Sequence, residues 1–252
     1  SAAQMPEPLP LFPLNTPLVP GLVLPLNIFE PRYRAMVREL LDEPRDEARE
    51  FGVIAIREGR DPLREGTDAL YGVGVSALLR QAEELEDGGF EIVTTGHRRF
   101  RLISVEPVPM GPAGAHSGDV TAADPDHDAG LSSPAPLLRA QVEFLAEATS
   151  ESDALLADQV ASRFREYRSA LGGQVQATVG EDEIPHDPTV LSYLVTAAMV
   201  VPQQERQQLL SADSTAARLT IARGMLSRET VLISELSAVP SLDIPGATPS
   251  VN

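Results

Sequence analysis

The chain of 252 residues contains no lysine, no cysteine and no tryptophan, and all twenty of its cationic side chains are arginine. Without lysine it cannot form a P-loop that holds nucleotide phosphates, a Ser–Lys catalytic dyad or a Schiff base, because each of these needs a side-chain amine. Without cysteine it cannot form disulfides, thiol nucleophiles or thiolate zinc sites. For this chain, these absences exclude several routes to nucleotide hydrolysis and covalent catalysis.

Positive charge is scarce relative to negative charge. The chain carries 37 acidic residues against 20 arginines, which gives a formal net charge of −17. Because nucleic-acid binding gains most of its affinity from cations that displace counterions, we expect no nucleic-acid partner. No apolar run approaches the roughly 20 residues that span a bilayer, and the N-terminus lacks the residue order of a signal peptide. We therefore expect a cytoplasmic protein without a membrane partner.

Aromatic residues make up only 4% of the chain, but 42% of it is hydrophobic, so Leu, Val, Ile and Ala must fill the core. The length fits one large domain or two ordinary ones, and we take two as the working assumption. In the first half, short apolar runs separated by Gly, Pro and acidic residues predict strands. Residues 86–89 have the composition of a hairpin turn. The predicted strands are at residues 9–14, 51–57, 69–80, 90–95 and 99–105, with a possible last strand at 118–122.

One helix interrupts these strands. Its apolar residues recur at the spacing of one helical face, Pro31 suits the first turn, and Pro44 follows the end. We therefore predict a helix over residues 31–42. The apolar residues on this face are Tyr33, Met36, Val37, Leu40 and Leu41.

The second half has helical periodicity. Apolar spacing predicts helices over residues 137–146, 155–167 and 189–201, the last of these capped by Asp187. A final helix, capped by Ser211 or Asp213, extends to about residue 236. We place the domain boundary near residue 125, in a segment rich in Pro, Gly, Ala and Asp. The expected organisation is a β-rich domain at 5–125, an α-helical bundle at 134–236, and flexible tails at 1–4 and 237–252.

Several motifs occur in an order that resembles the N-terminal domain of the Lon protease family. The motifs are LPLFPL at residues 9–14, PG at 20–21, LPLNIFEPRY at 24–33, FGVI at 51–54, YGVG at 71–74 and GHRRFR at 96–101. A weaker likeness continues through VP at 201–202, RQQLL at 206–210 and RL at 218–219. Together these motifs cover most of residues 8–230. The resemblance implies an α+β fold: an N-terminal PUA-like β-barrel-type domain with one inserted helix, followed by a C-terminal α-helical bundle.

The resemblance also implies a function. In Lon proteases this region recognises substrates and assists assembly, and the resemblance does not extend to the ATPase and protease domains that follow it there. We therefore expect a stand-alone, ATP-independent and non-enzymatic module that binds unfolded polypeptides or degron-like peptides in an apolar groove at the junction of its two domains. The alternative is an adaptor or assembly protein that binds a folded partner, such as full-length Lon or another protease. An uncharacterised hydrolase stays open as a third hypothesis.

Two groups of residues are candidates for polypeptide binding or contacts between domains. The first surrounds the predicted helix start, where Glu30 and Arg32 favour a structural role and Phe29 and Tyr33 are expected as core or hydrophobic-staple residues. The second is the only cationic cluster, His97 to Arg101, which we interpret as a solvated strand face paired with nearby acids in preference to an anion site. The candidate residues are Leu22, Leu24, Ile28, Phe29, Glu30, Arg32, Tyr33, Arg98 and Arg99.

Other polar residues give weak signals for chemistry. Asp124, Asp126 and Asp128 imitate the start of a calcium loop, but the glycine is one position late and position 12 is Ala135. No histidine has an i, i+4 partner, and no G-x-S-x-G motif surrounds a serine. We expect no cofactor, metal or catalytic residue. The histidines and serines considered are His116, His127, His186, Ser76, Ser104, Ser132 and Ser133.

Overall fold

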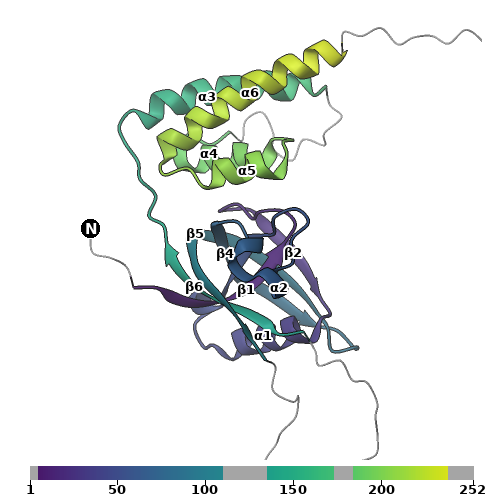
Figure 1. The fold of residues 1–252 in the computed structure, drawn as a ribbon. Helices are drawn as coiled ribbons and strands as arrows, with labels where there is room; N and C mark the ends of the chain where they lie inside the picture. Colours follow the sequence, from purple (N-terminus) through teal and green to yellow (C-terminus); the bar gives the residue numbers. More distant parts are fainter. Residues whose placement is uncertain (1–4, 110–134, 173–183, 238–252) are drawn as a thin grey trace, which may run out of the picture. The chain divides into compact units, whose positions relative to one another are not determined.

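The computed structural model describes residues 5–109, 135–172 and 184–237 (Figure 1). The chain divides into two compact units. The first comprises Ser1–Ala148 and Thr196–Ala212, and the second comprises Thr149–Val195 and Asp213–Asn252. A mixed sheet in the first unit and helices concentrated in the C-terminal half confirm the predicted α+β class.

The first unit contains six strands and most of the short helices. Helix α4 crosses the division between the units, because Val195 and Thr196 both lie within it. In chain order the elements of the first unit are β1 (Glu7–Leu14), β2 (Val23–Ile28), α1 (Pro31–Asp42), the 3-10 helix η1 (Asp46–Ala48), β3 (Glu50–Ala55), α2 (Pro62–Glu65), the 3-10 helix η2 (Gly66–Ala69), β4 (Val73–Glu84), β5 (Phe90–Val108), β6 (Leu137–Phe144) and α5 (Gln203–Leu210).

The sheet closes on itself. Its strand order is β2-β5-β4-β3-β1-β6, and β6 also pairs with β5. All pairs are antiparallel except β1 with β3. The 19 residues of β5 make this closure possible, because its first part pairs with β2 and its last part with β6. The ring of five strands, with β2 added at its edge, confirms the expected closed or nearly closed β domain.

Apolar side chains that alternate along the strands fill the interior of the ring. In β5, Phe100 and Leu102 are buried on either side of the exposed Arg101. Gly74 in β4 lies against the Phe100 ring, and a Cβ at position 74 would overlap that ring and the carbonyl oxygen of Val53. The close approach of backbone and ring therefore requires glycine here.

Helix α1 has the predicted bounds and buries the predicted face except Leu41, which is exposed. Tyr33 stacks near Phe12, with ring centroids 4.2 Å apart. On its outer face, Arg34 donates to the carbonyl oxygen of Asp87 at 3.2 Å, and Arg38 pairs with Glu84 at 3.1 Å. Two arginines one helical turn apart thus hold the β4–β5 hairpin against α1.

The predicted hairpin turn is confirmed. The amide of Leu85 donates to the carbonyl oxygen of Gly89, and the amide of Gly88 donates to that of Leu85, both at 2.9 Å. Gly88 has φ of 76°, a left-handed conformation that glycine adopts without strain.

The helix predicted over residues 137–146 is wrong, because β6 occupies residues 137–144. Leu138, Ala140, Val142 and Phe144 are all buried, at the period of two that a strand requires. A short apolar run fits both periods, and here pairing with β1 and β5 decides between them. The strand predicted at 118–122 and the boundary near 125 lie outside the described residues.

Residues 196–212, which the sequence assigns to the helical bundle, pack with the sheet. The side-chain amide of Gln203 donates to the carbonyl oxygen of Ile56 at 3.0 Å. That of Gln207 donates to the carbonyl oxygen of Val73 at 2.7 Å. These glutamines tie α5 to the strand ends of the first unit.

The second unit is helical. It contains α3 (Asp153–Ala170), most of α4 (Pro188–Ala198) and α6 (Thr215–Ser237). Asp187 caps α4 as predicted, since its Oδ1 accepts from the amide of Val190 at 2.8 Å. Ser214, rather than Ser211 or Asp213, caps α6, because its Oγ accepts from the amide of Ala217 at 3.1 Å. Within the described residues, no helix is long and apolar enough to cross a membrane.

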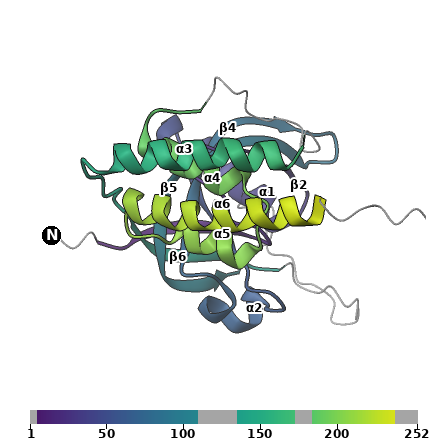
Figure 2. The ribbon, with the colours of Figure 1, turned by 90° about the horizontal axis from the view of Figure 1, so that it is seen from above.

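Helices α3 and α6 lie side by side and run in the same direction (Figure 2). From α3, Val160, Phe164 and Tyr167 are buried as predicted, whereas Leu155 is exposed. From α6, Leu219 and Leu226 are fully buried. The seam between the two helices is therefore an apolar core along one side of each.

Candidate functional site

Strand β2 is the open edge of the sheet. Among the described residues it pairs only with β5, and the carbonyl oxygens of Leu22 and Leu24 accept hydrogen bonds from Gly96 and Thr94 on that strand. Backbone groups alternate in direction along an antiparallel strand, so those of Val23, Pro25 and Asn27 are directed away from β5. Proline is tolerated at this position because no partner strand needs its missing amide.

Apolar side chains are exposed along this edge. Val23 is 59% exposed and Phe29, immediately after the strand, is 67% exposed, while Leu22 is also exposed. Leu24 is half-buried and Ile28 is buried. The expectation that Phe29 is a core or staple residue is wrong: Ile28 takes the inward position, and the Phe29 ring is exposed. The Nε of Arg34 donates to the carbonyl oxygen of Phe29 at 2.7 Å, which holds the backbone beneath the exposed ring.

The start of α1 lies next to this edge. Arg32 pairs with Glu30 at 2.7 Å and lies over the Tyr33 ring, 4.6 Å from its centroid. Tyr33 is buried in the core, as predicted. Burial raises the pKa of Tyr33 to about 12; Arg32 opposes this shift, and Glu30 adds to it. Glu30 and Arg32 thus pair at the helix start, and Arg32 Nη1 also donates to the carbonyl oxygen of Pro136, just before β6, at 3.5 Å.

A shallow hollow of about 660 Å³ lies on β2, β5 and β4. Glu83 and Glu91 are direct partners across the β4–β5 ladder, and two like charges so placed repel each other. A cationic group in the hollow would relieve that repulsion. No sequence motif marks this hollow, since its residues come together only through the strand register. The lining residues are Pro25, Leu26, Asn27, Gln81, Ala82, Glu83, Glu91, Ile92 and Val93.

Arg99 in the predicted cationic cluster is buried. It is 2% exposed, and its guanidinium donates to Glu147 at 2.8 Å and to the carbonyl oxygens of Leu210 and Ala212 at 2.9 and 2.7 Å. The predicted solvated face is therefore wrong at Arg99. Arg99 and Arg101 pair in regular register with Val75 and Val73, so the predicted alternation holds between them. Arg99 is buried because Glu147 and the carbonyl oxygens of Leu210 and Ala212 cover its guanidinium, whereas Arg101 is exposed.

The neighbours of Arg99 do pair with acids at the surface. Arg98 and His97 both contact Glu50, at 2.9 and 3.2 Å, and Arg101 contacts Glu143 at 3.2 Å. The Arg98 guanidinium also lies 3.5 Å from the centroid of the Phe144 ring. Each charged side chain of the cluster thus has an acidic partner within the chain, although the buried Nε of Arg98 has no hydrogen-bond partner among the described residues.

The remaining polar candidates are dispersed. Ser76 is buried and exchanges hydrogen bonds with the backbone of Arg98, and His186 is exposed. Within the part of the chain that the structure describes, no three His, Asp or Glu side chains are grouped so that they could hold a metal ion. The residues that lie outside the described parts are Asp124, Asp126, Asp128, His116, His127, Ser132 and Ser133.

Comparison with known proteins identifies relatives. The family model described as the ATP-dependent protease La (LON) substrate-binding domain matches residues 8–228. The chain is 26% identical over 250 residues to Lon protease 2 of Myxococcus xanthus. It is 25% identical over 246 residues to the Lon protease of Anaeromyxobacter dehalogenans (strain 2CP-C). Both alignments cover 94% of this chain, but the chain spans only 25% of the length of either relative.

Solved structures show the same fold. One is the Lon N-terminal domain protein from Xanthomonas campestris, with a TM-score of 0.53 and 19% identity. Another is the N-terminal domain of the Mycobacterium avium complex Lon protease, with a TM-score of 0.58 and 17% identity. Each similarity covers 88% of this chain and 98% of the other.

Proposed function

The chain belongs to the family of Lon substrate-binding domains, and from this membership we propose that it binds unfolded polypeptide or degron-like segments without catalysing a reaction. The observation that carries the proposal is the open edge of β2, where exposed apolar side chains lie beside unpaired backbone groups.

An edge strand suits a partner without a fixed sequence. An extended polypeptide can add to the sheet through backbone hydrogen bonds, which do not depend on its side chains. Val23 and Asn27 supply amides and carbonyls directed outward, whereas Pro25 supplies only a carbonyl. This gap keeps the edge from serving as a complete template for aggregation.

Side chains around the edge would set the preference for a client. Val23 and Phe29 favour aliphatic or aromatic residues, and fully burying one such side chain contributes about 1.5–3 kcal/mol. The hollow beside β2 has room for client side chains, and Glu83 and Glu91 favour a basic residue there. We therefore propose clients that combine apolar and basic residues in an extended segment.

The test is binding of a permanently unfolded basic protein, such as lysozyme that has been reduced and alkylated with the neutral reagent iodoacetamide, by calorimetry and hydrogen exchange. We expect protection of amides in β2. Val23→Asp should weaken binding about tenfold, a loss of about 1.4 kcal/mol. Val231→Asp is the matched control, because Val231 on α6 is 55% exposed, close to Val23.

Equal effects of the two substitutions, or no binding by the unmodified protein, would overturn the proposal. A protein that ignores unfolded chains but binds a folded Lon protease would favour the alternative, an adaptor for a folded partner. The cytoplasmic location and the residue set around Leu22–Tyr33, Arg98 and Arg99 stay predictions.

A further inference from the structure

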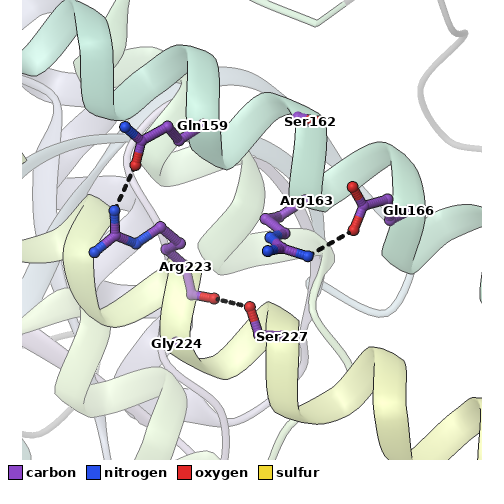
Figure 3. A pocket seen from close by; sticks show the side chains of 7 residues that line it. All are labelled: Gln159, Ser162, Arg163, Glu166, Arg223, Gly224 and Ser227. Carbon is purple, nitrogen blue, oxygen red and sulfur yellow. Dashed lines mark hydrogen bonds and ion pairs between the residues drawn. The ribbon is translucent and has the colours of Figure 1, made fainter.

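A second hollow lies between α3 and α6, within the second unit (Figure 3). Its volume is about 500 Å³. Arg163 projects into it from α3 and Arg223 from α6. The small side chains of Ser162 and Ser227 and the backbone of Gly224 also line it. Two guanidinium groups bring positive charge to this hollow, although the chain as a whole has a net charge of −17.

The two arginines differ in their partners. Arg163 pairs with the Glu166 carboxylate at 2.9 Å. Arg223 instead donates to the neutral side-chain amide oxygen of Gln159. With Glu166 as the acid in the lining, the hollow carries a net charge of about +1, which is that of the Arg223 guanidinium.

At Gly224 the hollow is lined by bare helix backbone, because glycine has no side chain. Glycine inside a helix is less favourable than alanine by roughly 0.5–1 kcal/mol, yet Gly224 lies well inside the 23-residue α6. A Cβ added at this position would meet no atom within 4 Å, so packing within the described chain does not require glycine. Its presence leaves the backbone open to close approach by another group.

We propose that this hollow binds a carboxylate of a polypeptide, either an Asp or Glu side chain or a chain terminus. Guanidinium groups bind carboxylates through paired parallel hydrogen bonds, and Arg223 still has donors beyond the one used by Gln159. The hydroxyls of Ser162 and Ser227 line the same space. A monoanion matches the charge of the hollow, whereas Glu166 would repel the second charge of a phosphate dianion.

The proposal shares with the proposed function only the class of partner, a polypeptide. The hollow lies in the second unit and is expected to bind acidic groups of a polypeptide. The β2 edge lies in the first unit and is expected to bind basic and apolar groups. Different variants test the two surfaces, Val23→Asp for the β2 edge and Arg223→Gln for the hollow, so either proposal can be overturned without the other.

The experiment is NMR titration of the uniformly ¹⁵N-labelled full chain, read at the Arg223 side-chain Nε–H and the Gly224 amide. The probes are a capped pentapeptide with one Glu, an alanine pentapeptide with a free C-terminus, and a neutral capped alanine pentapeptide. We expect saturable shifts with either or both of the first two and none with the third. Which of the two binds identifies the source of the carboxylate.

Arg223→Gln should weaken carboxylate binding about tenfold. The matched control is Arg165→Gln, which removes the same charge from an exposed position on α3 outside the hollow and should change binding by less than about twofold. Val23→Asp should leave carboxylate binding unchanged. Absence of shifts with both acidic probes, equal losses in the two arginine variants, or tighter binding of inorganic phosphate would overturn the proposal.

Discussion

Strand β5 and the α3–α6 hollow both present arginines, but the two regions use them differently. Arg99 donates to three acceptors of its own chain and is buried, while Arg98 and Arg101 each pair with a carboxylate. Arg223 has a neutral partner and faces an open hollow. The arginines of the GHRRFR motif thus bind acceptors within the chain itself. Arg223, an isolated arginine in a helix, still has donors that a ligand could bind. Unused donors, rather than a run of charges, indicate a binding role.

Removing Arg99 should give the largest effect. In Arg99→Leu, the buried side of Glu147 and the carbonyls of Leu210 and Ala212 lose their donor, and breaking a buried ion pair costs about 3–5 kcal/mol. Urea unfolding followed by circular dichroism should show this loss in the first unit. A loss of unfolding free energy below about 1 kcal/mol would contradict a structural role for Arg99, and with it the contrast with Arg223.

The dependence of stability on alkaline pH should reveal the burial of Tyr33 in the first unit, without substitution of an arginine. The pKa of Tyr33 is about 12 in the folded state, against an ordinary value of 10.0. The unfolded chain therefore loses this proton first, and stability should fall between pH 10 and 12 by about 2–3 kcal/mol. The chain lacks lysine and cysteine but has three further tyrosines, so a variant at position 33 is needed to isolate the contribution of Tyr33.

The control for this pH dependence is Tyr33→Phe, whose stability should fall less over the same range of pH. Urea midpoints at half-unit steps from pH 9 to 12 would measure both proteins. Parallel curves would contradict the assignment of the shift to Tyr33.

Gly224→Ala should stabilise the second unit by roughly 0.5–1 kcal/mol, because alanine favours the helix and its methyl group enters open space. Thermal unfolding would record the gain. Gly74→Ala is the contrasting variant and should destabilise, since its methyl group overlaps the Phe100 ring. If Gly224→Ala also destabilised, Gly224 would have a packing role and the hollow would lose one argument.

Arg101→Gln should have the smallest effect, below about 0.5 kcal/mol, because its ion pair with Glu143 is exposed to solvent. Urea unfolding in parallel with Arg99→Leu would measure the contrast between two positions of one strand that are separated by a single residue. A loss comparable with that of Arg99→Leu would show that exposure does not separate their roles.

Local signals predicted their elements well. Helix α1 starts at a proline and has one apolar face, and the β4–β5 turn contains two glycines, so both could be located from neighbouring residues alone. The family resemblance supplied the closed sheet. In contrast, β6 and the burial of Arg99 depend on partners more than 30 residues away, such as Glu7 for Val142 and Leu210 for Arg99. Periodicity carries no information about such partners.

The candidate surfaces follow the same division. Leu22 and Phe29 could be selected near a recognisable helix start, although the exposure of Phe29 was predicted wrongly. The hollow at Glu83 and Glu91 depends on strand register, and that at Arg163 and Arg223 depends on helix packing. Neither leaves a trace in residue spacing.

The closure of the sheet has a consequence for synthesis on the ribosome. Strand β1 pairs with β6, and Glu7 and its partner Val142 are 142 − 7 = 135 residues apart. At about 5–20 residues per second, roughly 7 to 27 s separate their synthesis. During that interval the ring cannot close, and the apolar residues Leu9 and Leu11 of β1 lack their β6 neighbours. The nascent chain is then most exposed to aggregation and most dependent on chaperones.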